Sequence, residues 1–251
     1  MGRVFITGVS DGIGLALAAL YLEKGWDVFG TARSVPHRLL GHENFHFKSC
    51  DLGNPLEIAN LLSDEFAVVA RDGVNLVYLN AGISGGAPRH GIDVKLADLS
   101  HTLMVNALAN KLLVDMFLSL PVRPDAFIAS ASIAGQRFRA GMLPYSMSKA
   151  ALLALLGTYA QEYPDIFFLP LGLCNVDTNL AHSIVFSDRA DAFPAHVALQ
   201  QRFSVPGYVV KPDDRARDIF SVVHSDLSAR LTSGEFVEIR HLLASTEAKE
   251  A

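Results

Sequence analysis

Tyr145 and Lys149 stand four positions apart in the segment YSMSK. Residues i and i+4 of a helix share one face, so a helix here places the Lys149 ammonium beside the Tyr145 phenol. A nearby cation favours the phenolate and lowers the pKa of a tyrosine from about 10 toward neutrality. Such a phenol can give a proton to a carbonyl oxygen or take one from an alcohol. A simple pair on a helix surface is the alternative explanation.

Ser132 and Asn106 are two further polar candidates. Ser132 directly follows an expected strand, and ligands of open α/β sheets bind at the carboxyl ends of strands. Its hydroxyl is therefore placed to hydrogen-bond a reacting oxygen, with a turn or helix cap as the structural alternative. Asn106 lies in the apolar run LMVNALA, where an amide either bonds a neighbouring element or anchors a water.

Three glycines, Gly8, Gly12 and Gly14, fall in the segment TGVSDGIG, between an expected strand and an expected helix. Glycine lets the backbone turn tightly and approach a ligand closely. The helix N-terminus then offers free N–H groups and a positive dipole end to a phosphate. The position of this turn in the first strand–helix unit favours a dinucleotide site over an ordinary turn.

The end of the second expected strand indicates which nicotinamide cofactor fits. An acidic residue there would bind the ribose hydroxyl of NAD, whereas an arginine suits the 2′-phosphate of NADP. The sequence has Ala32 at that position, followed by Arg33, which favours NADP(H) over NAD(H). Asp11 argues the other way, because it brings a negative charge near the same phosphate. A solvated Arg33 on the surface is the plain alternative.

These residues sit between regularly alternating elements. Apolar runs predict strands at 3–7, 27–32, 44–49, 75–79, 126–130, 166–171 and 235–239. Helical periodicity predicts helices at 12–24, 55–70, about 24 residues from Lys95, 145–163 and 212–224. The alternation predicts an α/β fold with a parallel sheet covered on both faces. We expect one domain over residues 1–245, an irregular lid over 179–211 and a frayed tail at 246–251.

Composition excludes several classes of protein. The chain has 251 residues, half of them hydrophobic, and a net charge of −5 without a basic stripe, which argues against nucleic acid and anionic membranes as partners. No apolar run is long enough to span a bilayer, and no secretory leader is visible, so a cytoplasmic location is expected. Cys50 and Cys174 are then reduced thiols, and the scattered histidines predict no metal site.

Taken together, the motifs resemble those of the short-chain dehydrogenase/reductase family. TGVSDGIG is similar to the cofactor turn of that family, NAG at 80–82 to its mid-sheet motif, and SIAG with YSMSK to its serine and YxxxK pair. The resemblance implies a Rossmann-type doubly wound parallel sheet of about seven strands. It also implies Tyr145 as acid/base, Lys149 as pKa tuner and ribose ligand, Ser132 as stabiliser of the oxygen and Asn106 as water anchor.

The same resemblance implies a set of cofactor-binding residues. These are Gly8, Ser10, Asp11, Gly12, Ile13, Gly14, Arg33, Asp51, Leu52, Asn80, Ala81, Gly82, Tyr145, Lys149, Val176 and Thr178. One departure is that Leu173-Cys174 stand where the family usually has Pro-Gly, which puts the shape of that turn in doubt. We expect Cys174 to be a small buried thiol rather than a nucleophile.

The C-terminal third is most similar to the sepiapterin reductase and benzil reductase group. We therefore expect NADPH-dependent reduction of an apolar or aromatic ketone or vicinal diketone, with Phe186, Phe193, Phe203 and Tyr208 available to contact it. A ketoreductase acting on oxoacyl thioesters or polyketides is the second enzyme hypothesis. A non-catalytic NADP(H)-binding module is the rival from another class. The apolar helix at 145–163 predicts a homodimer or homotetramer.

Overall fold

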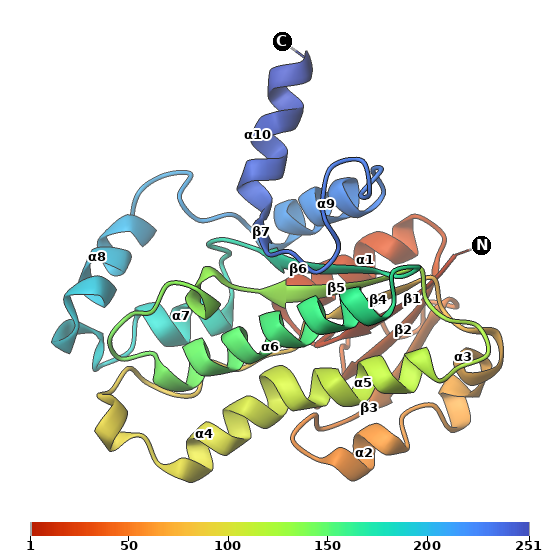
Figure 1. The fold of residues 1–251 in the computed structure, drawn as a ribbon, viewed down its shortest axis with the longest axis horizontal. Helices are drawn as coiled ribbons and strands as arrows, with labels where there is room; N and C mark the ends of the chain where they lie inside the picture. The colour runs from red at the N-terminus through yellow and green to blue at the C-terminus, as the bar shows by residue number, and fades with distance from the viewer. Residues whose placement is uncertain (1, 251) are drawn as a thin grey trace.

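The computed structural model describes residues 2–250, and for residues 245–250 only the backbone. Its centre is a parallel sheet in the order β3-β2-β1-β4-β5-β6-β7 (Figure 1). The strands are β1 (Arg3–Thr7), β2 (Asp27–Ala32), β3 (Phe45–Ser49), β4 (Leu76–Leu79), β5 (Ala126–Ala131), β6 (Phe167–Gly172) and β7 (Val237–Glu238). The strand order reverses direction between β1 and β4, and ligands of such sheets bind at this switch point.

Helices connect the strands and cover the sheet. They are α1 (Gly12–Glu23), α2 (Pro55–Ala59), α3 (Ala67–Asp72), α4 (Leu96–Leu103), α5 (Ala109–Leu118), α6 (Leu143–Glu162), α7 (Asn179–Val185), α8 (Pro194–Phe203), α9 (Pro212–Val223) and α10 (Ile239–Glu250). Short 3-10 turns occur at η1 (Asp64–Phe66), η2 (Gly91–Asp93), η4 (Ile133–Gly135) and η5 (Ala190–Ala192). The π-helical turn η3 (Met104–Leu108) joins α4 to α5. No helix among these described elements is long and apolar enough to cross a bilayer.

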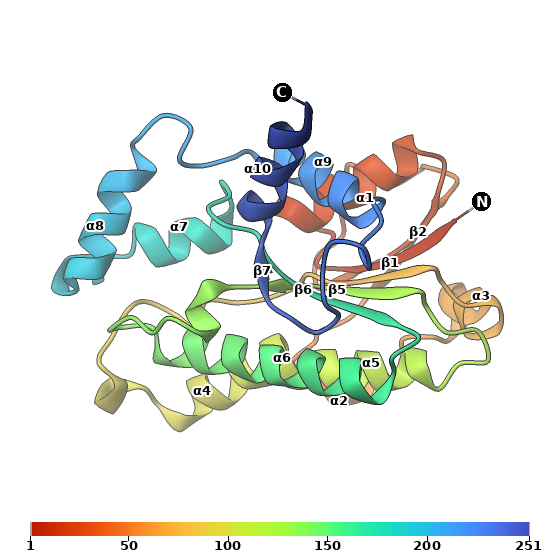
Figure 2. The same cartoon turned by 45° about the horizontal axis from the view of Figure 1, so that its top comes forward.

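The strands bury both faces, as their nearly continuous apolar sequences predict. Along β1, Val4 and Ile6 face a core shared with α1, α9 and α10, while Phe5 faces a second core beneath α2, α3, α5 and α6. Figure 2 shows these two helical layers on opposite sides of the sheet. The predicted doubly wound α/β fold is confirmed, and the carboxyl ends of the strands all open toward one edge.

One predicted helix, at 55–70, is interrupted. The chain forms α2, then η1, then α3, and Asp64 between them has a left-handed φ of +52°. Lys48 from β3 donates to the carbonyls of Asn60 and Ser63, at 2.9 and 3.1 Å. Because this side chain satisfies carbonyls that a continuing helix would use, the break is stabilised by a distant residue that local periodicity does not reveal.

The C-terminal third also differs from expectation. The stretch 179–211, expected to be irregular, contains α7 and α8. The last strand is only Val237–Glu238, shorter than the expected 235–239. The backbone of residues 246–250, expected as a frayed tail, continues α10, and residue 251 lies outside the described residues.

Candidate active site

The glycine turn has the backbone geometry that its sequence predicts. Gly8 and Gly12 have left-handed φ values of +78° and +55°, which side-chain-bearing residues rarely adopt. A Cβ on Gly14 would lie 2.2 Å from the carbonyl oxygen of Gly8. The three positions therefore require glycine for two different reasons, conformation and close approach. The turn leads directly into the N-terminus of α1, where unpaired N–H groups favour a phosphate.

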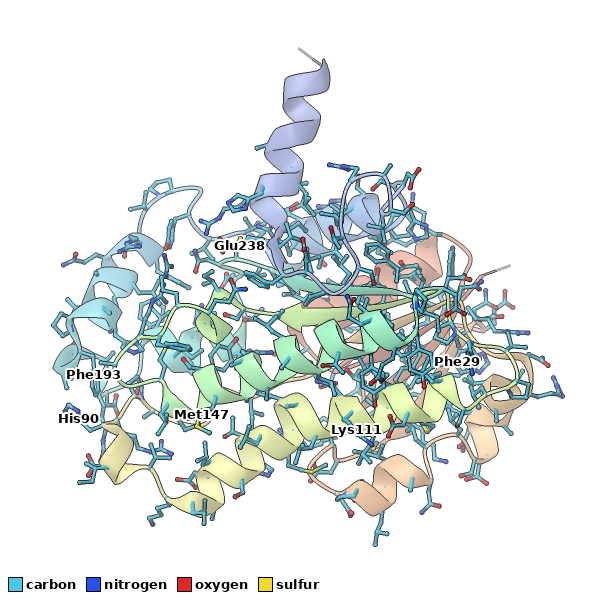
Figure 3. All side chains as sticks on the ribbon, viewed as in Figure 1. Phe29, His90, Lys111, Met147, Phe193 and Glu238 are labelled. Carbon is cyan, nitrogen blue, oxygen red and sulfur yellow. The ribbon has the colours of Figure 1, made fainter. Side chains whose placement is uncertain are left out.

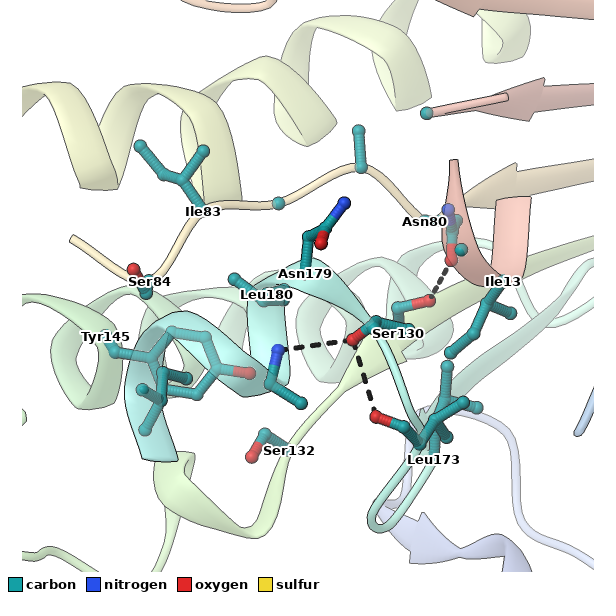
Figure 4. A pocket seen from close by; sticks show the side chains of 18 of the residues that line it. Ile13, Asn80, Ile83, Ser84, Ser130, Ser132, Tyr145, Leu173, Asn179 and Leu180 are labelled. Carbon is teal, nitrogen blue, oxygen red and sulfur yellow. Dashed lines mark hydrogen bonds between the residues drawn. The ribbon is translucent and has the colours of Figure 1, made fainter. Parts of the chain in front are cut away.

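Asn80 fixes the strand ends beside this turn. Its amide donates to the carbonyl of Thr7 at 3.1 Å, and its oxygen accepts from the Ser130 hydroxyl at 3.0 Å (Figure 4). The Thr7 hydroxyl in turn accepts the backbone N–H groups of Asn80 and Ala81, at 2.9 and 3.0 Å. The ends of β1, β4 and β5 are thus cross-linked at the switch point. Asn80 contributes mainly to the rigidity of this platform.

A cavity of about 800 Å³ runs along the carboxyl ends of the strands, from the glycine turn to Tyr145. It is large enough for a dinucleotide portion and a small substrate. Of the predicted site residues, Gly14 and Asn106 do not line it, and all the others do. Gly14 instead allows α1 to pack closely on the turn. The residues that the sequence motifs identified therefore lie around one space, although they are spread from Gly8 to Thr178.

Arg33 lines the cavity directly after the carboxyl end of β2, and Asp11 lines it within the glycine turn. The position expected to hold an acid in NAD-binding proteins is Ala32, so no carboxylate competes with Arg33 at that strand end. The Asp11 carboxylate accepts a hydrogen bond from Asn179 at 2.5 Å. This contact ties α7 to the glycine turn, which gives Asp11 a structural partner of its own.

Tyr145, Lys149 and Ser132 converge on one part of the cavity. Tyr145 and Lys149 lie on α6, and the Lys149 ammonium is 5.6 Å from the centre of the Tyr145 ring. Lys149 also donates to the carbonyl of Ser130 at 2.7 Å, which fixes its position. Figure 4 shows Tyr145 and Ser132 along the same wall of the pocket. The Ser132 hydroxyl accepts from the N–H of Ala134 at 3.1 Å, so it caps η4 while facing the cavity.

Burial controls the protonation of this group. It raises the pKa of the Tyr145 phenol, and the hydrogen-bonding hydroxyl of Ser132 offsets this only in part. Burial also lowers the pKa of Lys149 to about 8. Burial therefore opposes the expected lowering of the Tyr145 pKa by Lys149, because desolvation of the phenolate dominates. The phenol is protonated at neutral pH, as a proton donor must be.

Asn106 occupies the π turn between α4 and α5 and is fully buried. Its side-chain oxygen accepts from the N–H of Ile83 at 2.8 Å, and its amide donates to the Ile83 carbonyl and the Ser148 hydroxyl, at 2.8 and 2.9 Å. Its backbone carbonyl accepts from Asn110. Both amide hydrogens of Asn106 are thus engaged, and the residue clamps the segment after NAG to α6. Its role as a water anchor stays a prediction.

The turn after β6 keeps the shape of a glycine turn despite its sequence. Cys174 has a φ of +61°, a conformation that glycine adopts freely and cysteine does not. Its sulfur lies 3.9 Å from the carbonyl of Gly172 and 3.9 Å from a carboxylate oxygen of Glu238. Burial raises the pKa of this thiol, which opposes thiolate formation. Leu173 and Cys174 both line the cavity, so the replacement alters its wall without removing the turn.

The four aromatic residues of the expected lid divide into two pairs. Phe203 and Tyr208 line the cavity. Phe193 is 3% exposed and packs on His90, with ring centres 5.0 Å apart. Both residues are labelled at the left of Figure 3. Phe186 is 53% exposed and lies 5.9 Å from Phe203, behind the cavity wall. Only Phe203 and Tyr208 are therefore placed to contact a substrate.

Several lining residues escaped the sequence analysis. Ser130 holds both Lys149 and Asn80, and its only sequence signal was its place at the end of a strand. Arg202, Glu238 and Arg240 reach the cavity from α8, β7 and α10, and carry no recognisable motif. The fold and this site together define a class of protein, a dinucleotide-binding α/β domain with a tyrosine–lysine pair at the switch-point edge.

Comparison with known proteins gives the family. Residues 3–184 match the short chain dehydrogenase family, and the chain belongs to it. It is 28% identical over 172 residues to the NADPH-dependent 3-dehydrocapnine reductase of Ornithobacterium rhinotracheale, which covers 64% of this chain and 60% of that protein. It is 29% identical over 173 residues to Protein FixR of Bradyrhizobium diazoefficiens, covering 64% and 61%. The chain thus spans about three fifths of the length of the curated relatives that it matches.

Solved structures support the fold over nearly the whole chain. The KRED1-Pglu enzyme superposes with a TM-score of 0.80 at 21% identity, covering 94% of this chain and all of that one. A short chain dehydrogenase of Burkholderia cenocepacia, solved in complex with NADP, gives a TM-score of 0.76 at 24% identity, covering 94% and 95%. At these identities the likeness establishes the Rossmann-type fold.

Proposed function

We propose that this protein is an NADPH-dependent carbonyl reductase, in which Tyr145 gives the proton. The observation that carries the proposal is the convergence of Tyr145, Lys149 and Ser132 at one end of a cavity whose other end holds the glycine turn and Arg33. Family membership and an NADPH-dependent relative support it. Structural neighbours solved with NADP or NADPH bound are a further support.

The residues present fit a dinucleotide. The left-handed Gly8 and Gly12 leave room for a pyrophosphate at the N-terminus of α1, and Arg33 would pair with the 2′-phosphate. Asp51 and Leu52 would hold the adenine side, and Val176 and Thr178 the nicotinamide side. When bound, the cofactor supplies a hydride to the carbonyl carbon.

The side chains of this protein supply the other half of the reaction. As the carbon gains the hydride, negative charge develops on the carbonyl oxygen, and the Tyr145 phenol donates its proton there to form the alcohol. Ser132 would donate a hydrogen bond to the same oxygen and so hold it in place. Lys149, fixed by the Ser130 carbonyl, would stabilise the resulting phenolate. The raised pKa of Tyr145 favours this direction, because the resting phenol is protonated.

The proposed substrates are ketones and vicinal diketones with an apolar or aromatic part beside Phe203 and Tyr208. The resemblance of the C-terminal third to the sepiapterin and benzil reductases supports the diketones. Oxoacyl thioesters remain the second class.

The proposal also includes a cytoplasmic location, supported by the free thiols of Cys50 and Cys174. It includes a homodimer or homotetramer, supported by the exposed apolar residues Leu96, Leu108 and Met147 on and around α4 to α6. Light scattering that shows only 27.1 kDa particles would contradict the oligomer.

The activity test follows the loss of NADPH or NADH absorbance with an aromatic diketone, a pterin diketone and an acetoacetyl thioester. We expect turnover with NADPH, and a drop in kcat of about 1,000-fold in Tyr145→Phe with NADPH affinity kept within a few-fold. The best substrate decides between the two enzyme classes. Tight NADPH binding without any Tyr145-dependent turnover would instead support the non-catalytic binding module.

A further inference from the structure

Three arginines from two distant segments line the substrate end of the cavity. Arg137 and Arg139 follow η4, a few residues after Ser132, and Arg202 comes from the last turn of α8. We call these three residues the arginine cluster. None of the three forms an ion pair or a side-chain hydrogen bond with any described residue. All three line the same cavity, where Glu238 is the nearby carboxylate that acts on Arg139.

Arg139 is the partly buried member of the arginine cluster, whereas Arg137 and Arg202 are exposed. Burial lowers the pKa of the Arg139 guanidinium, with Arg137 and Arg202 acting in the same direction. Glu238 is the carboxylate that counteracts them, and it already pairs with Arg240. For the partly buried Arg139, a bound anion would offset the cost of burial and the repulsion by Arg137 and Arg202. Three guanidinium groups around one space therefore form a site that suits an anionic ligand.

The cofactor is not that anion. Arg33, which suits the 2′-phosphate, follows β2, whereas the segment with Arg137 and Arg139 follows β5. Three strand spacings separate β2 from β5, about 14 Å. The glycine turn for the pyrophosphate follows β1, also on the far side of the switch point. Arg137 and Arg139 lie on the other side of the switch point, after the same strand as Ser132.

We propose that the substrate carries an oxoanion, such as a carboxylate, which the arginine cluster binds while Tyr145 and Ser132 hold the carbonyl. This inference rests on the proposed function and names its substrate class. Guanidinium groups bind carboxylates through paired hydrogen bonds, which lysines cannot do. Phe203 and Tyr208 line the same end of the cavity, so the substrate has an apolar body with an anionic group attached. A half-buried Arg139 indicates a small group entering the cavity and not a protein surface docking outside it.

The test uses pairs of ketones, each a carboxylate and the neutral ethyl ester of the same acid. Benzoylformate and benzoylbutyrate carry a carboxylate near to and far from the ketone, and their ethyl esters are neutral. We expect kcat/KM to be at least about tenfold higher for one acid than for its ester, with the difference shrinking at high salt. Arg139→Gln and Arg202→Gln should each remove most of this preference and leave kcat/KM for the esters within about twofold. Arg71→Gln, an exposed residue paired with Asp72, is the control that keeps the preference.

A preference for both esters, or an equal loss for acid and ester in the arginine variants, would overturn the inference while leaving the reductase function intact. If no ketone is reduced, the proposed function fails, and binding decides the inference separately. Calorimetry on the NADPH-loaded protein should then show that an acid binds more tightly than its ester, and that Arg139→Gln abolishes the difference. Equal or absent binding of acid and ester would exclude an oxoanion site.

Discussion

The two halves of the cavity are built in different ways. The cofactor half consists of backbone turns and strand ends, fixed by Thr7 and Asn80 and shaped by glycines. The substrate half consists of side chains from the segment around η4 and from α6, α7, α8 and α10, together with a non-glycine residue in a glycine conformation. The first half is specified by short contiguous motifs. The second is assembled from segments that meet only in the folded chain, which allows its specificity to vary while the cofactor site stays constant.

The largest effect is expected where the cofactor half is most tightly packed. Gly14→Ala places a methyl group against the Gly8 carbonyl, so it should lower the free energy of unfolding by about 2–3 kcal/mol and abolish NADPH binding. Gly25→Ala is a control that separates strain from close approach, since Gly25 has a left-handed φ of +77° and open space around it, whereas Gly14 has no left-handed φ. Gly25→Ala should cost about 1 kcal/mol and preserve binding. Equal effects of both changes, measured by urea unfolding and NADPH titration, would contradict the close approach as the reason that position 14 requires glycine.

Removing one positive charge from each half in turn tests whether the two halves act independently. Arg33→Gln should raise the KM for NADPH about 10- to 100-fold and leave that for NADH nearly unchanged, because only NADPH has the 2′-phosphate. Arg139→Gln should leave the ratio of NADPH to NADH efficiency within about twofold. Steady-state kinetics with both cofactors and both variants measures this directly. A loss of NADPH preference in Arg139→Gln would show that the two halves are not independent.

Lys149, at the boundary between the halves, predicts a pH dependence of stability. Its pKa falls from 10.5 to about 8 on folding, so between these values the unfolded chain binds more protons than the folded one. Burial of Lys149 therefore destabilises the folded protein at low pH, and this penalty shrinks as the pH rises. The free energy of unfolding should increase by about 1 kcal/mol from pH 7 to pH 9. Urea unfolding of the wild type minus that of Lys149→Met isolates the contribution from other titrating groups. A difference that falls or stays constant over this range would contradict the burial of a charged Lys149.

The smallest effect is expected at Cys174 in the substrate half. Cys174→Gly removes the strain of a side-chain-bearing residue at a left-handed φ, which stabilises the folded state. Glycine also increases the conformational freedom of the unfolded chain, which opposes this gain, so the free energy of unfolding should change by less than about 1 kcal/mol. Cys174→Val keeps the strain and adds a β-branch, and should destabilise by about 1–2 kcal/mol. Thermal unfolding of both variants checks the order. A valine variant as stable as the glycine variant would mean that the turn relaxes to another conformation.

Local sequence predicted much of the fold. Apolar runs such as 3–7 and 126–130 became strands because a sheet covered on both faces requires residues that are apolar on both sides. The long helix from Lys95 was confirmed with the addition of a π turn. The interrupted 55–70 segment was missed because the side chain that stabilises the break, Lys48, belongs to another element. The helices within 179–211 were missed because their apolar pattern is weak.

The sequence by itself determined the glycine turn, the tyrosine–lysine spacing and the place of Ser132, since each depends on residues a few positions apart. The tertiary structure decided which polar groups remain available. It engages both amide hydrogens of Asn106 with Ile83 and Ser148, and it brings Arg202 to Arg137 and Arg139. It also decided the sign of the Tyr145 pKa shift. Burial and long-range contact control these properties, and neither can be read from local spacing.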